Sequence, residues 1–488
     1  MDFFPFLAAL FLIIAATWLI SFRRRKSLPP GPTPLPIIGN MLQLGSHPLE
    51  TYTKLSKKYG SLMSIHQGSL YTVVVSSPEM AKEILLKYGQ GISGRGTVQA
   101  MEACGHKESS MSFIPMGDDW RDMRKICKEH MFSSQCLERS QQLRNQKLQQ
   151  LLGYVQKCAE EGRAVNINEA SFITTVNLMS ATLFSMQATE FDSSATMEFK
   201  EIMEGYGILL RVPNYADYFP ILRPFDLQGV KRLAEVNIGR LLGLIEGYIN
   251  ERIRIRRENP NVPKKDDFLD VIVDSLQAKD NKLTATQFNH LVLTLFTGGV
   301  ETSTTMLEWI MQELVSHPDK MAKVEAELKS VMGDEKVVDE SKIPKLQYMQ
   351  AVVKESFRLH PPVPLVTRKA ESDQVVNGYL IPKDTQVLVN AWGMGRDSRI
   401  WKNPLSFEPE RFLDQKIDFK GHDFELIPFR SGRRVCPGLP LANRILHTMP
   451  ATLVHNFDWK LERPDASDDE AKGVRRAVPL KVIPYKKA

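Results

Sequence analysis

The chain has 488 residues, of which 43% are hydrophobic and 25% charged, so it has the proportions of a globular protein with a large core and not those of a disordered one. Its net charge of +6 is small, and its basic residues are scattered apart from RRRK at 23–26, which excludes a typical nucleic-acid-binding protein. Five irregularly spaced cysteines, without a CxxC pair or a Cys/His cluster, exclude a disulfide framework and a zinc site. We therefore expect reduced thiols in a domain that faces the cytosol.

The first predicted element is an apolar helix at the amino terminus. Residues 3–22 are twenty consecutive residues without a charge, about the length that a helix needs to cross a bilayer. A cleaved signal peptide would carry positive charges before its apolar run and small residues at a cleavage site after it. Here Asp2 precedes the run and four basic residues follow it. The sequence therefore predicts a transmembrane anchor over 1–22, with the amino terminus in the lumen and the rest of the chain in the cytoplasm.

The globular part of the chain is expected to begin near residue 41. Prolines in LPPGPTPLP at 28–36 favour an extended, stiff segment, so residues 23–40 are predicted to form a basic and proline-rich linker. No internal repeat, low-complexity segment or second linker follows. Residues 41–488 are therefore predicted to form one domain.

Most of this domain has apolar residues at helical spacing. Apolar residues recur every three or four positions in the segments 137–160, 229–256, 285–316 and 343–359. Strand signals are few, and they lie in 62–76 with a turn at Gly68, in 375–389 with a turn at Asn377 and Gly378, and as another pair in the last thirty residues. The predicted class is mainly α with a small β portion.

One cysteine lies in an unusual setting, the stretch FRSGRRVCPG at 429–438. A cysteine is more often a buried structural side chain than a ligand. A thiolate that binds haem iron, however, needs backbone amides of a tight loop near its sulfur and cations that offset the carboxylates of the haem. The residues around Cys436 that suit those demands are Gly432, Arg433, Arg434 and Gly438, and Phe429 could shield the sulfur from water.

This stretch resembles the FxxGxRxCxG signature of the cytochrome P-450 superfamily. The resemblance implies that Cys436 is the axial ligand of the haem iron and that Phe429, Arg434 and Gly438 belong to the cofactor site. It also implies the fold of that family, which agrees with the mainly helical pattern.

Two other motifs resemble family features that support the fold. KESFR contains Glu355 and Arg358, one helical turn apart, which can form an ion pair on one helix face. Such a pair by itself is usually part of a solvated helix surface. FEPERF supplies Arg411, which in the family joins this pair in a buried triad beside the haem-binding core. Because such a triad serves the fold, these residues are not predicted to be catalytic.

The stretch TGGVETST at 297–304 lies inside a long apolar helical segment. Two glycines in a helix cost about 1 kcal/mol each relative to alanine, and close packing against another helix is one explanation for them. The stretch also resembles the family motif [AG]Gx[DE]T[TS]. That resemblance implies that Gly298 and Gly299 leave room for dioxygen over the iron, while Glu301 and Thr302 deliver protons.

The stretch WRDMR places Trp120 and Arg124 four residues apart on one helical face. By resemblance to the family, both would bind a haem propionate, and Arg368 would be a further propionate partner. The predicted cofactor site thus combines Cys436 with residues from several distant segments.

The resemblance implies a haem-thiolate monooxygenase that uses heme b (iron protoporphyrin IX) and O2. The chain has no GxGxxG or other flavin or nicotinamide fingerprint, so electrons are expected from NADPH through the membrane-bound NADPH-cytochrome P-450 reductase. The expected location is the endoplasmic reticulum membrane, with a single-pass anchor and a cytoplasmic catalytic domain. No nucleic-acid partner is expected.

Other segments resemble the plant terpenoid hydroxylases, the group of ferruginol synthases and geraniol hydroxylases. These segments are SSPEMAKEIL, WRDMRKICKEHMFS, VPNYADYFPILRPFD and VRRAVPLKVIP. The implied substrate is an apolar terpenoid, an abietane-type diterpene or alternatively a geraniol-type monoterpenoid, and the apolar segment 206–222 is either its membrane-side entrance or ordinary core. A haem-thiolate isomerase or dehydratase, or a non-catalytic haem protein, is a different class. Glu301 and Thr302 argue against both, because neither needs a proton relay.

Two positions depart from the family pattern. Position 430, usually glycine in the form FGxGxRxCxG, is Arg430, which would cost roughly 1 to 2 kcal/mol if the backbone there has a positive φ. A competing expectation is that Arg430 adds charge to the proximal face, where an acidic reductase docks. The segment HPPVPLVTRKA, which borders the substrate pocket in the family, is one residue shorter than usual before Arg368.

Overall fold

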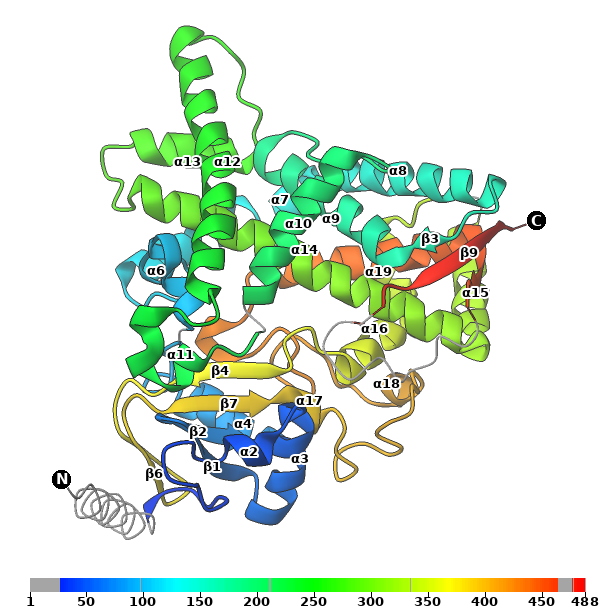
Figure 1. Ribbon diagram of the computed structural model, residues 1–488. Coiled ribbons are helices and arrows are strands. Elements are labelled where there is room, and N and C mark those ends of the chain that lie inside the picture. The colour runs from blue at the N-terminus through cyan, green and yellow to red at the C-terminus, as the bar shows by residue number, and fades with distance from the viewer. Residues whose placement is uncertain are drawn as a thin grey trace, which may run out of the picture.

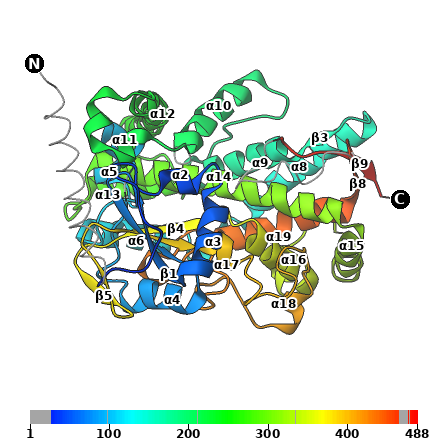
Figure 2. The ribbon, with the colours of Figure 1, turned by 60° about the horizontal axis from the view of Figure 1, so that its bottom comes forward.

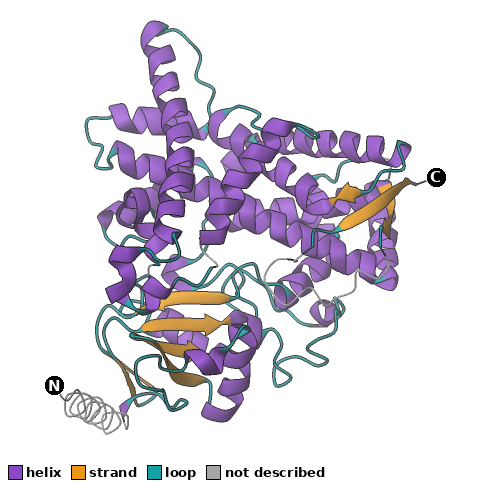
Figure 3. Cartoon of the chain, viewed as in Figure 1, coloured by secondary structure: helices purple, strands orange, loops and turns teal. Residues whose placement is uncertain are grey.

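The computed structural model describes residues 27–96, 98–209, 212–333, 335–463, 476 and 478–487. Helices dominate these residues, and the strands gather in small groups (Figure 3). The prediction of a mainly α chain with a small β portion is confirmed. Among the described residues, no helix combines the length and apolarity needed to cross a membrane, and the predicted anchor at 1–22 lies outside them.

The helices are, in chain order, α2 (Met41–Leu44), α3 (Pro48–Tyr59), α4 (Pro78–Lys82), η2 (Glu83–Lys87), η3 (Gln99–Gly105), α5 (His106–Ser109), α6 (Asp118–His130), α7 (Ser134–Arg139), α8 (Gln141–Glu160), α9 (Ile167–Phe184), α10 (Ser194–Leu209), α11 (Tyr215–Tyr218), η4 (Pro220–Phe225), α12 (Val230–Glu258), α13 (Phe268–Gln277), α14 (Ala285–Ser316), α15 (Pro318–Met332), η5 (Glu340–Lys345), α16 (Gln347–Leu359), α17 (Ala391–Met394), α18 (Arg411–Asp414), η6 (Gly432–Arg434) and α19 (Leu439–Asn456). The strands are β1 (Leu62–Gln67), β2 (Leu70–Val75), β3 (Val165–Asn166), β4 (Leu365–Lys369), β5 (Gln374–Val376), β6 (Tyr379–Ile381), β7 (Gln386–Asn390), β8 (Phe457–Leu461) and β9 (Lys481–Lys486).

The strands form three small sheets. One sheet has the order β1-β2-β7-β4, in which β2 and β7 are parallel and the other pairs antiparallel; the others are β3-β9-β8 and the hairpin β5-β6. The predicted turns are confirmed, because Gly68 between β1 and β2 has a φ of 58°, and Asn377 and Gly378 between β5 and β6 have φ values of 50° and 79°. Two successive positive φ values are those of a tight two-residue hairpin turn. Figure 2 shows α3 beside β1, and α17 packs against α3 and β4.

The described part of the proline-rich segment is bonded to the first sheet. The amide of Ser64 in β1 donates a hydrogen bond to the carbonyl of Pro30 at 2.8 Å, and the Ser64 hydroxyl donates to the carbonyl of Pro29 at 2.7 Å. A Cβ atom on Gly31 would lie 1.9 Å from the Ser64 carbonyl oxygen, so only glycine allows this approach. From Pro29 onward the chain therefore lies against the sheet, where the sequence led us to expect an extended spacer.

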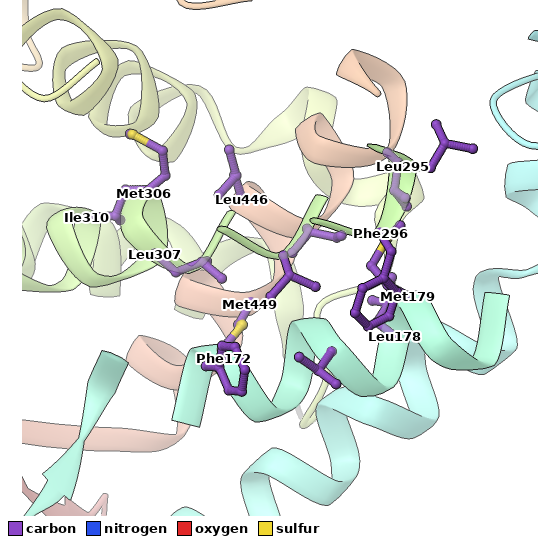
Figure 4. Close-up of a cluster of buried hydrophobic side chains, with 14 of the residues drawn as sticks. Phe172, Leu178, Met179, Leu295, Phe296, Met306, Leu307, Ile310, Leu446 and Met449 are labelled. Carbon is purple, nitrogen blue, oxygen red and sulfur yellow. The ribbon is translucent and has the colours of Figure 1, made fainter. Parts of the chain in front are cut away.

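Helix α14 occupies the middle of the helical part (Figure 1). It begins at a capping box, in which the Thr284 side chain accepts a hydrogen bond from the amide of Gln287 while the Gln287 side chain accepts one from the amide of Thr284. Its bounds are those that the apolar spacing predicts. It packs against α9, α12, α16 and α19. Figure 4 shows part of this core, with the labelled side chains Phe172, Leu178, Met179, Leu295, Phe296, Met306, Leu307, Ile310, Leu446 and Met449.

The predicted buried triad is present at the end of α16. The Nε and Nη2 atoms of Arg358 each donate a hydrogen bond to Glu355 at 2.7 Å, and the side chains of both residues are fully buried. The Nε atom of Arg411 donates to Glu355 Oε1 at 3.1 Å, and the amide of Glu408 donates to the same oxygen at 2.8 Å. These hydrogen bonds to one buried carboxylate tie α16 to the segment before α18.

Candidate active site

A cavity with an empty volume of about 1310 Å³, part of it open to solvent, lies between α14 and the loop before α19. The loop 429–438 contributes Cys436 to its lining, and α14 contributes Gly298 and Thr302. Cys436 and the TGGVETST stretch, which are far apart in the sequence, therefore meet at one cavity.

The loop around Cys436 is held by its own backbone. The Cys436 amide donates a hydrogen bond to the carbonyl of Phe429 at 3.0 Å, and the Ser431 hydroxyl donates to the carbonyl of Gly421 at 2.6 Å. Gly432 has a φ of 69°, and a Cβ atom on it would lie 2.4 Å from the carbonyl oxygen of Leu85. Glycine at 432 is therefore required both by the left-handed backbone and by the close approach of η2.

The sulfur of Cys436 lies in a setting that both opposes and favours a thiolate. Burial raises the pKa of the Cys436 thiol, because the charged form is poorly solvated there. The amides of Gly438 and Leu439, at the start of α19, bond to the sulfur and favour the thiolate, as do the charges of Arg430 and Arg124. Such a sulfur is suited to bind a positively charged partner that offsets the cost of burial.

Phe429 lines the cavity at the start of this loop. Its ring packs against the rings of Phe357 and Phe419, with centroid distances of 5.2 and 5.6 Å. The three rings form an apolar wall near the loop. This arrangement agrees with the expectation that Phe429 keeps water away from the Cys436 sulfur.

Four arginine side chains line the cavity and a fifth lies behind it, and none of them forms an ion pair with a carboxylate among the described residues. The members of this group, called the arginine cradle below, are Arg95, Arg124, Arg368, Arg430 and Arg434. No ion pair joins any of them to a carboxylate in the part of the chain that the structure describes, and the buried Nε atoms of Arg95 and Arg434 lack an acceptor there. Burial, reinforced by repulsion from Arg430 and Arg434, lowers the pKa of Arg368 to about 9. Burial also lowers the pKa of Arg434 to about 10, although the charge of Glu371 opposes this shift.

Arg368 and Arg434 are buried and the other three members of the arginine cradle are half-buried, so this group of positive charges favours binding of an anion from outside the chain. A haem has two propionate carboxylates, and its iron takes a thiolate as axial ligand. The arginine cradle and the Cys436 sulfur therefore fit this group. This fit rests on two independent observations. One is the group of arginines without a carboxylate partner among the described residues, and the other is the Cys436 sulfur.

Trp120 and Arg124, on α6, lie where the sequence predicts them. The guanidinium groups of Arg124 and Arg434 each lie 5.5 Å from the centroid of the Trp120 ring. Arg124 also donates a hydrogen bond to the carbonyl of Val435 at 2.8 Å, and Arg434 donates to that of Ile114 at 2.6 Å. The indole thus holds two guanidinium groups at the rim of the site.

Arg368 lies on β4 and is buried, but it is not among the residues that line the cavity. The carbonyl of Thr367 accepts one hydrogen bond from Arg368 at 3.0 Å and one from Arg95 at 2.9 Å. The shortened segment before it still reaches the site, because Pro362 and Val363 line the cavity. Sequence reasoning missed Arg95, whose only signal is its place between Gly94 and Gly96 in a loop.

The two glycines of α14 have different environments. A Cβ atom on Gly298 would meet no atom within 4 Å, whereas one on Gly299 would lie 3.0 Å from the Sδ and Cε atoms of Met179 on α9. Gly298 therefore leaves space in the cavity, as the family resemblance implies. Gly299 also lines the cavity, but close packing against α9 explains its lack of a side chain.

The two predicted proton donors also differ in position. Thr302 lines the cavity, and its hydroxyl donates a hydrogen bond to the carbonyl of Gly298 at 2.7 Å. Glu301 is not among the lining residues. It lies on the side of α14 that approaches Tyr206 of α10, where burial first and then the Glu301 charge raise the pKa of the Tyr206 phenol to about 12. The structure thus brings Thr302, but not Glu301, to the cavity surface.

The family model for cytochrome P-450 matches residues 29–484, nearly the whole chain. The chain belongs to the cytochrome P-450 family. As a cytochrome P-450 it is a haem-dependent monooxygenase whose electrons come from NADPH through a reductase.

Several curated relatives are similar over their full lengths. The chain is 71% identical over 493 residues to a sugiol synthase of Salvia miltiorrhiza and 72% identical over 493 residues to a ferruginol synthase of Salvia fruticosa, with 100% of both chains covered in each case. It is 44% identical over 489 residues to a carnosic acid synthase of Rosmarinus officinalis, with 97% of both chains covered.

The different environments of the two glycines predict opposite outcomes for alanine. Gly298→Ala is expected to stabilise this P-450 by up to about 1 kcal/mol, because alanine favours helix and its methyl group meets no atom, while the methyl group in the cavity lowers turnover. Gly299→Ala must displace Met179, so its gain in stability is reduced or reversed. Thermal unfolding and product formation by both variants measure this, and equal shifts in melting temperature would contradict the assignment.

Proposed function

We propose that this P-450 is a membrane-anchored monooxygenase that hydroxylates an apolar terpenoid, specifically an abietane-type diterpene, as a ferruginol synthase does. The observation that carries the chemistry is the Cys436 sulfur beside a cavity whose arginines have no carboxylate partner among the described residues. The substrate class is supported by the full-length relative named ferruginol synthase, which is 72% identical.

In this proposal the cofactor is held from two directions. Cys436 would ligate the iron through its sulfur, to which the amide of Gly438 is bonded, and Phe429 would exclude water from that sulfur. Trp120, Arg124, Arg368 and Arg434 hold the propionate side through the charges and the indole described above. When bound, the haem supplies the activation of dioxygen and the insertion of one oxygen atom into a C–H bond, which thiolate ligation favours.

In this proposal, residues of α14 deliver protons and keep part of the cavity free of side chains. Gly298 keeps the cavity open beside the Thr302 hydroxyl, whose proton points to the Gly298 carbonyl. The Thr302 oxygen can accept a hydrogen bond from a water molecule in the cavity, and rotation of the hydroxyl brings its proton into the cavity. Glu301, at the preceding position of α14 and on its α10 side, is the second proton donor of this proposal.

The rest of the cavity suits an apolar substrate. Besides the residues above, its lining includes the apolar side chains of Met111, Phe132, Met179, Leu295, Met306 and Val363. Such a surface binds a hydrocarbon through burial of apolar area and offers few hydrogen bonds for a polar substrate.

Reductase-dependent oxygenation of a diterpene tests this function. Microsomes that contain the full-length protein and a reductase should convert an abietane-type hydrocarbon into an oxygenated product only when NADPH is present, as product analysis by mass spectrometry shows. The matched control is Cys436→Ser, which should lose the reduced carbon-monoxide absorption band and all turnover, because a hydroxyl does not replace the thiolate.

Other outcomes would redirect the assignment. Oxygenation of geraniol-type monoterpenoids alone would favour the alternative substrate class. Rearrangement of an oxygenated substrate without NADPH would mean an isomerase or dehydratase. A Cys436→Ser variant that keeps the band would remove Cys436 from the ligand role.

The proposed role of Thr302 predicts a loss of coupling. Thr302→Ala should retain haem and bind substrate, yet consume NADPH with less product and more hydrogen peroxide, because the hydroxyl that delivers protons is absent. Thr302→Ser keeps a hydroxyl and is the control. NADPH consumption, peroxide and product are measured together, and an unchanged ratio of product to NADPH in the alanine variant would exclude the relay.

We also propose that residues 1–22 anchor the protein in the endoplasmic reticulum membrane, with the catalytic domain on the cytoplasmic side. The sequence supports the anchor, and an apolar edge of the domain supports a second contact with the membrane. On this edge Ile37 and Ile221 are 74% and 80% exposed. Gly68 links the two segments, because its amide bonds the carbonyl of Ile38 and the next amide, of Ser69, bonds that of Tyr218.

Removal of the anchor should therefore weaken membrane binding without abolishing it. A chain lacking residues 1–22 should keep its carbon-monoxide band and sediment partly with membranes, because the apolar edge remains. Ile37→Glu with Ile221→Glu should then release it. Leu405→Glu, at a residue 75% exposed before α18, is the control and should have little effect. Recovery of the full-length protein in the soluble fraction would contradict the anchor.

A further inference from the structure

Arg430 is the residue of the haem loop that departs most from local rules. Its φ is 65°, in the left-handed region that favours glycine. This confirms the expectation of a strained backbone, which an arginine has to tolerate. Glycine at this position would relax the loop at once, so the side chain needs a compensating contact.

The side chain of Arg430 does not serve the outer surface. It lines the cavity, and it lies close enough to Arg95, Arg368 and Arg434 for its charge to disfavour theirs. The expectation that it adds charge to the reductase-docking face is therefore wrong. Arg433, in the same loop, is exposed and has the position that such a role needs.

Arg430 also differs from the other members of the arginine cradle in its hydrogen bonds. Every other member of the arginine cradle donates at least one hydrogen bond to a backbone carbonyl: Arg95 and Arg368 to Thr367, Arg124 to Val435, and Arg434 to Ile114. Within the described ranges, no protein atom accepts a hydrogen bond from the guanidinium of Arg430, although burial favours its neutral form and lowers its pKa. Arg430 is half-buried and lines the cavity, so a guanidinium without a protein acceptor there is suited to bind an anion that enters the cavity.

We propose that Arg430 binds a carboxylate of the cofactor, as a further propionate ligand that compensates for the left-handed backbone on which it stands. The inference rests on the proposed haem site. Glycine, which usually occupies this position, has no side chain for such a contact with the cofactor. The guanidinium donates to a carboxylate oxygen, and no bond is made or broken.

The rate of haem loss tests the contact. Purified full-length holoprotein in detergent is mixed with excess apomyoglobin, and haem transfer is followed by absorbance. Arg430→Gln keeps the Cβ atom and the stem but removes the charge, so it should lose haem roughly ten- to a hundredfold faster than the wild type, the effect of one buried charge-assisted contact. Arg430→Lys should be intermediate, because the charge remains without the planar fork. Arg433→Gln, which removes the same charge from the surface, should behave as the wild type.

A second comparison identifies the group that Arg430 contacts. In protein reconstituted with iron protoporphyrin IX dimethyl ester, whose carboxyls carry no charge, Arg430→Gln and the wild type should lose the cofactor at the same rate. If the difference between them persists, Arg430 acts on the Cys436 side and the propionate assignment is overturned.

The variant Arg430→Gly tests whether backbone strain or the charge of the guanidinium has the larger effect on the rate of haem loss. This variant relieves the left-handed backbone and also removes the guanidinium, so we expect faster haem loss than in the wild type. Slower loss would mean that strain dominates and would overturn the proposal, as would an Arg430→Gln variant with the wild-type rate. A wild-type protein that binds no haem would instead overturn the proposed function, so the two failures are distinguishable.

Discussion

The active site of this P-450 depends on positive charges that have no carboxylate partner among the described residues. The arginine cradle gathers guanidinium groups from the loop at Arg95, from α6, from β4 and from the haem loop around one cavity, without a carboxylate partner in the described parts of the chain. Like charges at such a site repel each other, and burial adds to the cost. A folded chain with this arrangement is stabilised when an anion enters, so cofactor binding and folding of the site are thermodynamically linked.

A second group of buried charged residues, in contrast, finds its partners within the chain. Arg358 and Arg411 pair with Glu355 inside the chain, Arg411 also pairs with Glu408, and backbone carbonyls accept further hydrogen bonds from Arg358. This triad needs no ligand and can hold α16 and the segment before α18 in place before any cofactor binds. The molecule thus separates charges that serve the framework from charges that serve the cofactor, although both groups are arginine-rich.

The sequence predicted the parts of the site that depend on local pattern. Cys436, Trp120 and Thr302 were found because the loop, the helix spacing and the family motifs are short and continuous. Arg95 was missed because its role arises from tertiary approach, with no local pattern except flanking glycines. For Gly299 the sequence leaves oxygen access and close helix packing both open, and the structure identifies Met179 of α9 as its packing partner. Helix α9 itself lacks helical periodicity because nearly all its residues are buried, so no polar face alternates with an apolar one.

Arg430 shows how a broken local rule can indicate function. From the sequence alone, an arginine in place of glycine predicts either a strained backbone or an added charge on the face where a reductase docks. The structure shows both the left-handed backbone at 430 and a side chain that lines the cavity, while Arg433 is exposed. A cost in backbone energy is kept where a buried contact offsets it. Arg430 has both the strained backbone and the charge without a protein partner. The carboxylate that neutralises this charge therefore also stabilises the strained conformation of the loop.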